Sequence, residues 1–183
     1  MKTIIIYTSK TGFTEKYANW LSGRLDAILM TFDEAKKIND TVFDEADAII
    51  YGGWVMAGKV VGVEWFTQKI DNWKGKRLAV FAVGGCPNDA PDIEENLKNI
   101  LSDEQRKYAK AFYCQGGMNY DRMKLPSKLA MKAFASMVSK KKDKTEADEK
   151  MAEMIVRSYD ISDEKYIEPI VSYVMEPNDA QSV

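Results

Sequence analysis

The stretch from Ile4 to Thr14 constrains the fold of this chain more than any other. An apolar, β-branched run leads directly into a segment rich in hydroxyl side chains, and a helical pattern begins at Thr14. A strand therefore enters a loop of the size that holds a phosphate group, and the loop ends at a helix N-terminus. Such a terminus favours an anion, and Ser and Thr hydroxyls add uncharged donors. Gly12 lets the backbone approach the ligand closely.

The spacing within this loop excludes two common phosphate-binding motifs. The dinucleotide fingerprint needs three glycines in the pattern G-x-G-x-x-G, and only Gly12 is present. The P-loop pattern G-x-x-x-x-G-K-[ST] is also absent. The alternative to a phosphate loop is an ordinary strand–turn–helix junction in which Thr14 caps the helix. Four hydroxyl side chains at positions 8–14 exceed what one cap requires.

Composition is that of a globular protein in one domain. The chain has 183 residues, 45% of them hydrophobic and 30% charged, which is long enough to bury a full core. A net charge of −2 argues against a nucleic-acid binder. The apolar run at 3–7 is too short for a signal peptide or a membrane span. We expect a cytoplasmic protein with a single domain over 1–175.

The chain contains no histidine, which limits the chemistry that its own side chains can perform. Ser-His and Cys-His triads are excluded, and we expect no metal site. Redox chemistry would therefore depend on a bound cofactor. Cys86 and Cys114 follow two predicted strands. We expect free thiols in a reducing compartment, with a disulfide as the alternative.

Strands and helices alternate along the first two thirds of the chain. Several strands are continuous apolar runs, a pattern typical of a parallel sheet buried on both faces. Residues 32–46 are expected to be irregular, and 176–183 to form a disordered tail. The predicted strands are 3–7, 27–31, 48–51, 78–83 and 110–113. The predicted helices are 14–22, 63–73, 93–101, a short one from 103, and then 127–139, 145–157 and 163–175.

Right-handed crossovers between such strands give an α/β fold with a doubly wound, five-stranded parallel sheet. In the order 2-1-3-4-5, ligands bind at the carboxyl ends of the strands, beside the first and third strands. Glycine pairs at 52–53, 84–85 and 116–117 follow three predicted strands. They favour loops that approach a flat ligand at this rim, although tight turns alone would also use them.

The loop pattern resembles the FMN-phosphate loop of the flavodoxins. The matching positions are Tyr7, Ser9, Thr11, Gly12, Thr14, Ala18 and Leu21. The chain is also similar to a narrower branch, the flavodoxin-domain proteins that include the menaquinone-dependent protoporphyrinogen oxidases. That similarity rests on Ser9-Lys10-Thr11-Gly12-Phe13-Thr14, on segments 52–59 and 80–84, and on Gly116-Gly117 followed by Tyr120.

The resemblance implies that FMN is the cofactor and that three loops hold it. The first loop would bind the phosphate, and the second and third would hold the isoalloxazine ring. Trp54 or Met56 could lie against the ring, and Lys59 near its N1. The alternatives are core burial for Trp54 and a solvated charge for Lys59. The implied cofactor-binding residues are Thr8, Ser9, Lys10, Thr11, Gly12, Phe13, Thr14, Trp54, Val55, Met56, Ala57, Gly58, Lys59, Gly84, Gly85, Cys86, Pro87, Asn88 and Asp89.

Residues 121–144 form a basic, amphipathic insertion before the later helices, where seven lysines and Arg122 outnumber Asp121 and Asp143. Apolar residues recur among them at helical spacing. Three interpretations remain open. The segment is an ordinary surface helix, or it contacts a membrane surface or a quinone. In the third, it forms a docking surface for an acidic partner or a lid over the flavin.

These features predict an FMN-binding, flavodoxin-like oxidoreductase. It would transfer electrons from a reduced donor, such as a protoporphyrinogen, to a quinone or another acceptor. The alternative is an electron carrier that acts only through protein redox partners. A third possibility is a flavin-free domain that keeps the fold for binding alone, although the retained loop hydroxyls argue against it. We expect no nucleic-acid partner. Through 121–144 the protein could make peripheral contact with the membrane, at the inner membrane face.

Overall fold

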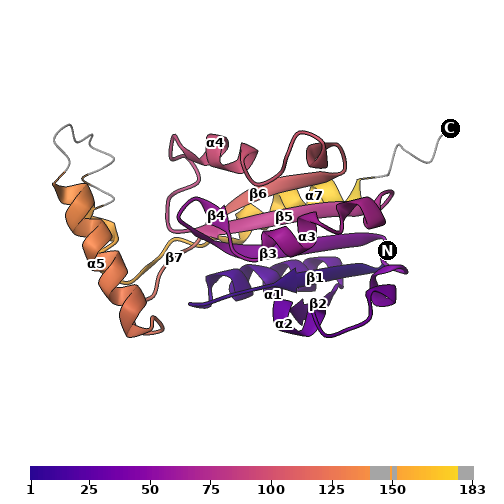
Figure 1. The fold of residues 1–183 in the computed structure, drawn as a ribbon, viewed down its shortest axis with the longest axis horizontal. Helices are drawn as coiled ribbons and strands as arrows, with labels where there is room; N and C mark the ends of the chain where they lie inside the picture. The colour runs from indigo at the N-terminus through magenta and orange to yellow at the C-terminus, as the bar shows by residue number, and fades with distance from the viewer. Residues whose placement is uncertain (141–148, 150–151, 177–183) are drawn as a thin grey trace.

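A parallel sheet runs through the body of the protein, with helices on both faces (Figure 1). The computed structural model describes residues 1–140, 149 and 152–176. The strand order β2-β1-β3-β5-β6 confirms the predicted order 2-1-3-4-5, in which β5 and β6 are the fourth and fifth strands. These strands are β1 (Thr3–Tyr7), β2 (Ile28–Thr31), β3 (Ala48–Met56), β5 (Arg77–Gly84) and β6 (Ala109–Gln115).

Each face of the sheet has its own apolar core, because successive side chains of a strand point to opposite faces. Ile5 packs in the core beneath α1 (Phe13–Leu25) and α7 (Glu168–Met175). Ile4 and Ile6 pack in the other core, with α3 (Val63–Thr67). The remaining short helices are α2 (Phe32–Ala35), α4 (Ile93–Lys98), η1 (Asp40–Phe43), η2 (Ile70–Trp73), η3 (Gln105–Lys107) and η4 (Glu164–Ile167).

The prediction that Gly52-Gly53 ends the third strand is wrong. Strand β3 continues to Met56 and turns back into a short antiparallel strand, β4 (Lys59–Val60), which adds a sixth strand to the sheet. Ala57 and Gly58 occupy the turn with φ of 49° and 77°. Two positive φ values match the twist of a tight hairpin. Residues 54–59 are therefore a β-hairpin and not an open loop.

Several helical predictions also differ from the structure: 163–175 is divided into η4 and α7, and 93–101 ends at Lys98. Helix α1 does not stop at Gly23 but continues to Leu25, whose side chain is buried in the core, and Asp26 ends it in the left-handed conformation. The predicted helix 63–73 is divided into α3 and η2.

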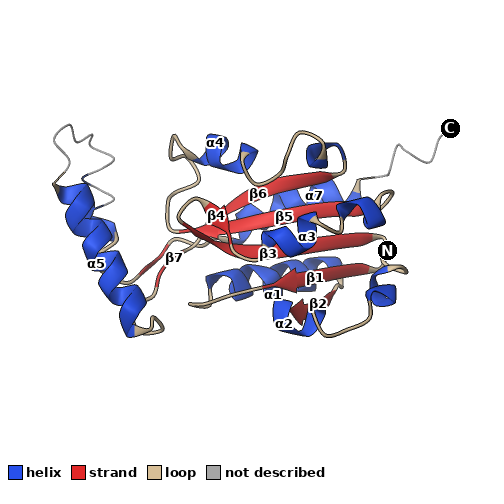
Figure 2. Ribbon diagram, viewed as in Figure 1, coloured by secondary structure: helices blue, strands red, loops and turns tan. Residues whose placement is uncertain are grey.

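A two-stranded ribbon marks the base of the insertion. Strand β7 (Gly117–Met118) pairs antiparallel with β8 (Tyr159–Asp160), and neither was predicted. Between them lies α5 (Leu125–Ser139), which stands away from the sheet at one end of the molecule (Figure 2). It confirms the predicted helix 127–139. Residues 145–148, 150 and 151 of the predicted helix 145–157 and the tail from 177 lie outside the described residues, and the helical part ends at residue 154. In the described part of the chain, no helix has the length and apolar character needed to span a membrane.

Buried tyrosines should make the fold sensitive to alkali. Burial raises the pKa of Tyr17, Tyr51 and Tyr113, and raises that of Tyr159 to about 12. An unfolded tyrosine has a pKa of about 10, so above that pH the unfolded chain releases protons that the folded chain retains. The free energy of unfolding is therefore expected to fall as the pH rises beyond about 10. Urea unfolding at a series of pH values would measure this, and a flat profile would contradict it.

Candidate functional site

The segment 8–14 forms a loop between β1 and α1, as the sequence predicts. The Thr8 N–H donates to the Gly52 carbonyl over 2.9 Å, which fixes the start of the loop against β3. The Ser9 hydroxyl accepts from the Gly12 N–H at 3.1 Å. Gly12 is the N-cap of α1 with φ of 100°, a conformation that favours glycine. The first N–H groups of α1 have no partner within the helix, as at any helix start.

Thr14 does not cap α1, so the cap interpretation of this residue is wrong. Its side chain is only 1% exposed, and its Oγ1 has no hydrogen-bond partner among the described residues. Leaving a buried hydroxyl unpaired is costly. A buried donor beside the unpaired N–H groups of a helix start fits an anionic ligand. On this observation, the residues present fit the phosphate of FMN.

A pocket of about 510 Å³ opens beside this loop. One wall consists of Thr11, Gly12, Phe13 and Lys16. The other wall comes from the β7–β8 ribbon, the residues adjoining it and the start of the insertion: Met118, Asn119, Asp121, Arg122, Ser158, Tyr159 and Asp160. The insertion therefore forms part of the candidate site and is not a remote appendage.

Arg122 brings a positive charge to the phosphate loop. A β-carbon built on Gly12 would lie 2.6 Å from Nη1 of Arg122, so the guanidinium rests against the glycine. Arg122 forms no ion pair with any residue that the structure describes. The sequence pattern showed Arg122 only as one cation in a basic stretch. Its position over the loop depends on the path of the insertion, which no local signal encodes.

Lys16 is the other cation of the pocket, and it is already paired. Its Nζ lies 2.9 Å from Oδ2 of Asp160 and donates to the Ser162 hydroxyl over 2.7 Å. Partial burial opposes ionisation of Asp160, but hydrogen bonds from Ser162 and Lys16 hold its pKa below the usual value. This ion pair links α1 to β8, so it braces the wall of the pocket.

Trp54 and Lys10, both predicted site residues, lie together. Lys10 Nζ is 5.2 Å from the centroid of the Trp54 ring and donates to Ser127 of α5 over 2.8 Å. Trp54 is partly exposed and belongs to neither core, so the core interpretation of this residue is wrong. Val55 is also partly exposed. Met56, Ala57, Gly58 and Lys59 are exposed on the β3–β4 hairpin.

The third predicted loop is held rigidly against β6 and β8. The Asn88 N–H donates to the Gln115 side chain over 2.9 Å, and the Gln115 N–H donates to Asn88 Oδ1 over 2.8 Å. The carbonyls of Gly85 and Cys86 accept from the hydroxyls of Tyr159 and Tyr113, each at 2.8 Å. These bonds fix the backbone after Gly84, and of the side chains in this loop that of Asn88 takes part.

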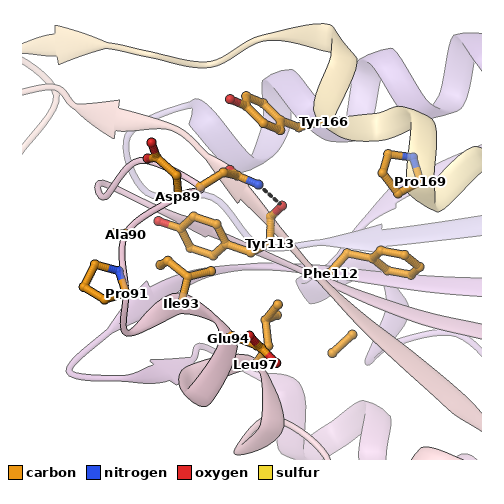
Figure 3. Close-up of a pocket in the computed structure, with 12 residues that line it drawn as sticks. Asp89, Ala90, Pro91, Ile93, Glu94, Leu97, Phe112, Tyr113, Tyr166 and Pro169 are labelled. Carbon is orange, nitrogen blue, oxygen red and sulfur yellow. Dashed lines mark hydrogen bonds between the residues drawn. The ribbon is translucent and has the colours of Figure 1, made fainter.

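Asn88 and Asp89 do not join the pocket at the phosphate loop. They line a second pocket of about 470 Å³, between α4, the edge strand β6 and the start of α7 (Figure 3). The two pockets share no lining residue. The structure thus places Thr11, Gly12 and Phe13 in one pocket, and Asn88 and Asp89 in another.

Both cysteines are free thiols. Burial raises the pKa of Cys86 and of the deeply buried Cys114. Each therefore stays protonated near neutral pH, and neither is a reactive thiolate.

The family model described as flavodoxin domain matches residues 4–146. A WrbA-like flavodoxin of Agrobacterium tumefaciens is 19% identical, with a TM-score of 0.49, over 66% of this chain and 87% of that one. A flavoprotein of Lactobacillus acidophilus NCFM, solved in complex with FMN, is 16% identical, with a TM-score of 0.44, over 62% and 91%. No curated protein matches.

Proposed function

Since the chain belongs to the flavodoxin domain family, whose cofactor is FMN, we propose that it is an FMN-dependent oxidoreductase. It would pass electrons from a reduced donor to a quinone or another acceptor. One observation carries the proposal: the unpartnered, buried hydroxyl of Thr14, in the first turn of α1 and two residues after its N-cap Gly12. This is a ready-made donor set for a phosphate group.

Residues from several elements would hold FMN. The loop 8–14 and Arg122 would bind the phosphate, and Trp54 and the backbone at 84–86 would border the ring. Bound FMN supplies the electron relay that no side chain of this chain provides. Tyr113 and Tyr159 have raised pKa values because they are buried, so they serve as neutral hydrogen-bond donors and not as bases. With no histidine in the chain, protons would move through water or the cofactor.

The donor and acceptor proposed first are a porphyrinogen and a quinone. Their support is the resemblance to the menaquinone-dependent protoporphyrinogen oxidases, carried by the loop 9–14 and segments 52–59 and 80–84. In each turnover two electrons and two protons would leave the donor, and the quinone would take up two electrons and two protons to become a quinol. The apolar residues of the insertion suit such partners.

Replacing Thr14 by valine separates cofactor binding from folding. Valine keeps the shape but removes the hydroxyl. The FMN-free protein should become more stable, because a buried unsatisfied group is lost, while FMN affinity should fall about tenfold. Thermal melting without FMN and a fluorescence titration with FMN measure the two effects. Unchanged FMN affinity would show that Thr14 does not contact the phosphate.

The catalytic proposal is tested with the FMN-loaded protein. Anaerobic protein is mixed with a porphyrinogen and menadione, and porphyrin fluorescence and quinone reduction are recorded together. A porphyrinogen loses six electrons and six protons on becoming a porphyrin, so one porphyrin formed for every three quinones reduced supports the proposal. Rapid electron transfer to a protein acceptor such as cytochrome c, without quinone reduction, would instead favour the carrier. Absence of FMN binding would overturn both.

A further inference from the structure

The outer face of α5 is an exposed apolar surface. Leu125, Leu129 and Met137 are 70%, 60% and 64% exposed, and Phe134 is 40% exposed. Leu125, Leu129 and Met137 share one row of the helix, at intervals of four or eight residues. The opposite side contains Ala135, which is buried. The row of Leu125, Leu129 and Met137 is thus left uncovered in the structure.

Positive charge borders this apolar row. Residues 122–140 contain Arg122, Lys124, Lys128, Lys132 and Lys140, and no Asp or Glu. Lys124, Lys128 and Lys132 form a second row beside the leucines. Because the whole chain has a net charge of −2, these five cations leave −7 on the rest of the protein. The insertion is therefore a basic end on an acidic body.

We propose that the outer face of α5 docks on an anionic membrane surface. Leu125, Leu129 and Met137 would enter the boundary between headgroups and acyl chains. The flanking lysines would reach the lipid phosphates through their long side chains. Charge complementarity favours this occupant, since lipid phosphates attract the basic end and repel the acidic body. Two copies paired through α5 would bring like charges together instead.

This orientation fits the position of α5 in the molecule. The helix stands away from the sheet, so its outer face can meet a flat surface without contact from α1 or α4 (Figure 1). The same insertion carries Arg122 to the phosphate loop. Docking would therefore place the candidate flavin pocket near the membrane, where lipid-soluble acceptors are found. The docking itself does not depend on FMN.

Co-sedimentation with lipid vesicles tests the proposal on the full chain. The expected result is binding to vesicles of equal parts phosphatidylglycerol and phosphatidylcholine, with little binding to phosphatidylcholine alone. The triple variant Lys124→Gln, Lys132→Gln, Lys140→Gln should bind about 100-fold more weakly, at about fivefold per lysine. The matched control is Lys37→Gln, Lys98→Gln, Lys107→Gln, which removes the same charge from the body and should bind like the natural chain.

A second variant and a measurement of oligomeric state distinguish a membrane surface from a second copy of the chain as the partner of this face. Leu129→Gln with Met137→Gln should lower binding about tenfold or more while leaving all charges in place. No vesicle binding would overturn the proposal. A dimer seen by sedimentation, lost in this double variant and unaffected by lipid, would assign the face to a second copy. Each measurement is repeated without FMN. The lipid-binding result can then be interpreted even if the protein does not bind FMN.

Discussion

Replacing Arg122 by alanine should weaken FMN binding by about 10- to 150-fold, because a hydrogen bond to a charged group contributes about 1.5–3 kcal/mol. The guanidinium rests against Gly12 at the start of α1, where the phosphate would bind. Riboflavin, which lacks the phosphate, should bind Arg122→Ala and the natural chain equally well. Fluorescence titration with both flavins measures the difference.

Two comparisons make the result specific to the phosphate. Lys140→Ala removes the same charge from the far end of α5 and should leave both affinities unchanged. Arg122→Lys keeps the charge but loses the planar fork, so it should lie between alanine and arginine. An equal loss for FMN and riboflavin would mean that Arg122 supports the shape of the pocket and does not bind the phosphate.

The contact between Arg122 and the phosphate should also make FMN affinity depend on pH. A phosphate monoester has a second pKa of about 6 and becomes a dianion above it. The dianion binds a guanidinium more strongly, so FMN affinity should decrease as the pH falls below about 6. In Arg122→Ala this decrease should be smaller. An identical pH profile in both proteins would argue against direct contact.

Replacing Phe81 by alanine should lower the free energy of unfolding by about 3–5 kcal/mol. Phe81 is fully buried in the interior strand β5, and its ring fills the space beside Gly52 of β3. Gly52 also accepts the hydrogen bond from Thr8 that positions the phosphate loop. Loss of the ring should therefore weaken FMN binding as well. Urea unfolding and FMN titration of the same preparation measure both effects.

A double-mutant cycle tests whether the ring and the glycine are complementary. A β-carbon on Gly52 would overlap the Phe81 ring, so Gly52→Ala alone should be destabilising. In Phe81→Leu the smaller side chain leaves room, and adding Gly52→Ala there should cost less than in the natural chain. Strict additivity would contradict this packing. Ile28→Ala, at a half-exposed position of the edge strand β2, should cost far less than Phe81→Ala.

The sheet could be predicted from the sequence because its signals are local. Each parallel strand is a short apolar run, and right-handed crossovers leave few ways to order such strands. The extension of β3 through Gly52 and Gly53 could not be predicted, since a glycine pair ordinarily marks a turn. Here glycine has another role: a side chain at position 52 would overlap the ring of Phe81, which lies on the neighbouring strand β5. That contact joins residues far apart in the chain.

The candidate site could also be predicted only in part. The loop 8–14 is contiguous, so its hydroxyls and glycine could be recognised together. Arg122 and Tyr159 reach the site from distant positions, through the pairing of β7 with β8. Two-residue strands give no periodic signal. The place of Asn88 and Asp89 beside the flavin stays a prediction, since the network with Gln115 holds them at a pocket separate from the phosphate loop.

The β7–β8 ribbon also makes the segment between its two strands a module whose length can change independently of the sheet. Met118 and Tyr159 face each other as a register pair, so the chain leaves the body and returns to it at neighbouring points. Residues 119–158 therefore close a loop whose ends are already joined, and the entropy of closing such a loop changes only slowly with its length. Lineages could lengthen, shorten or exchange this module while the sheet stays intact. A single scaffold could in this way acquire new partners by changing only what lies beyond the ribbon.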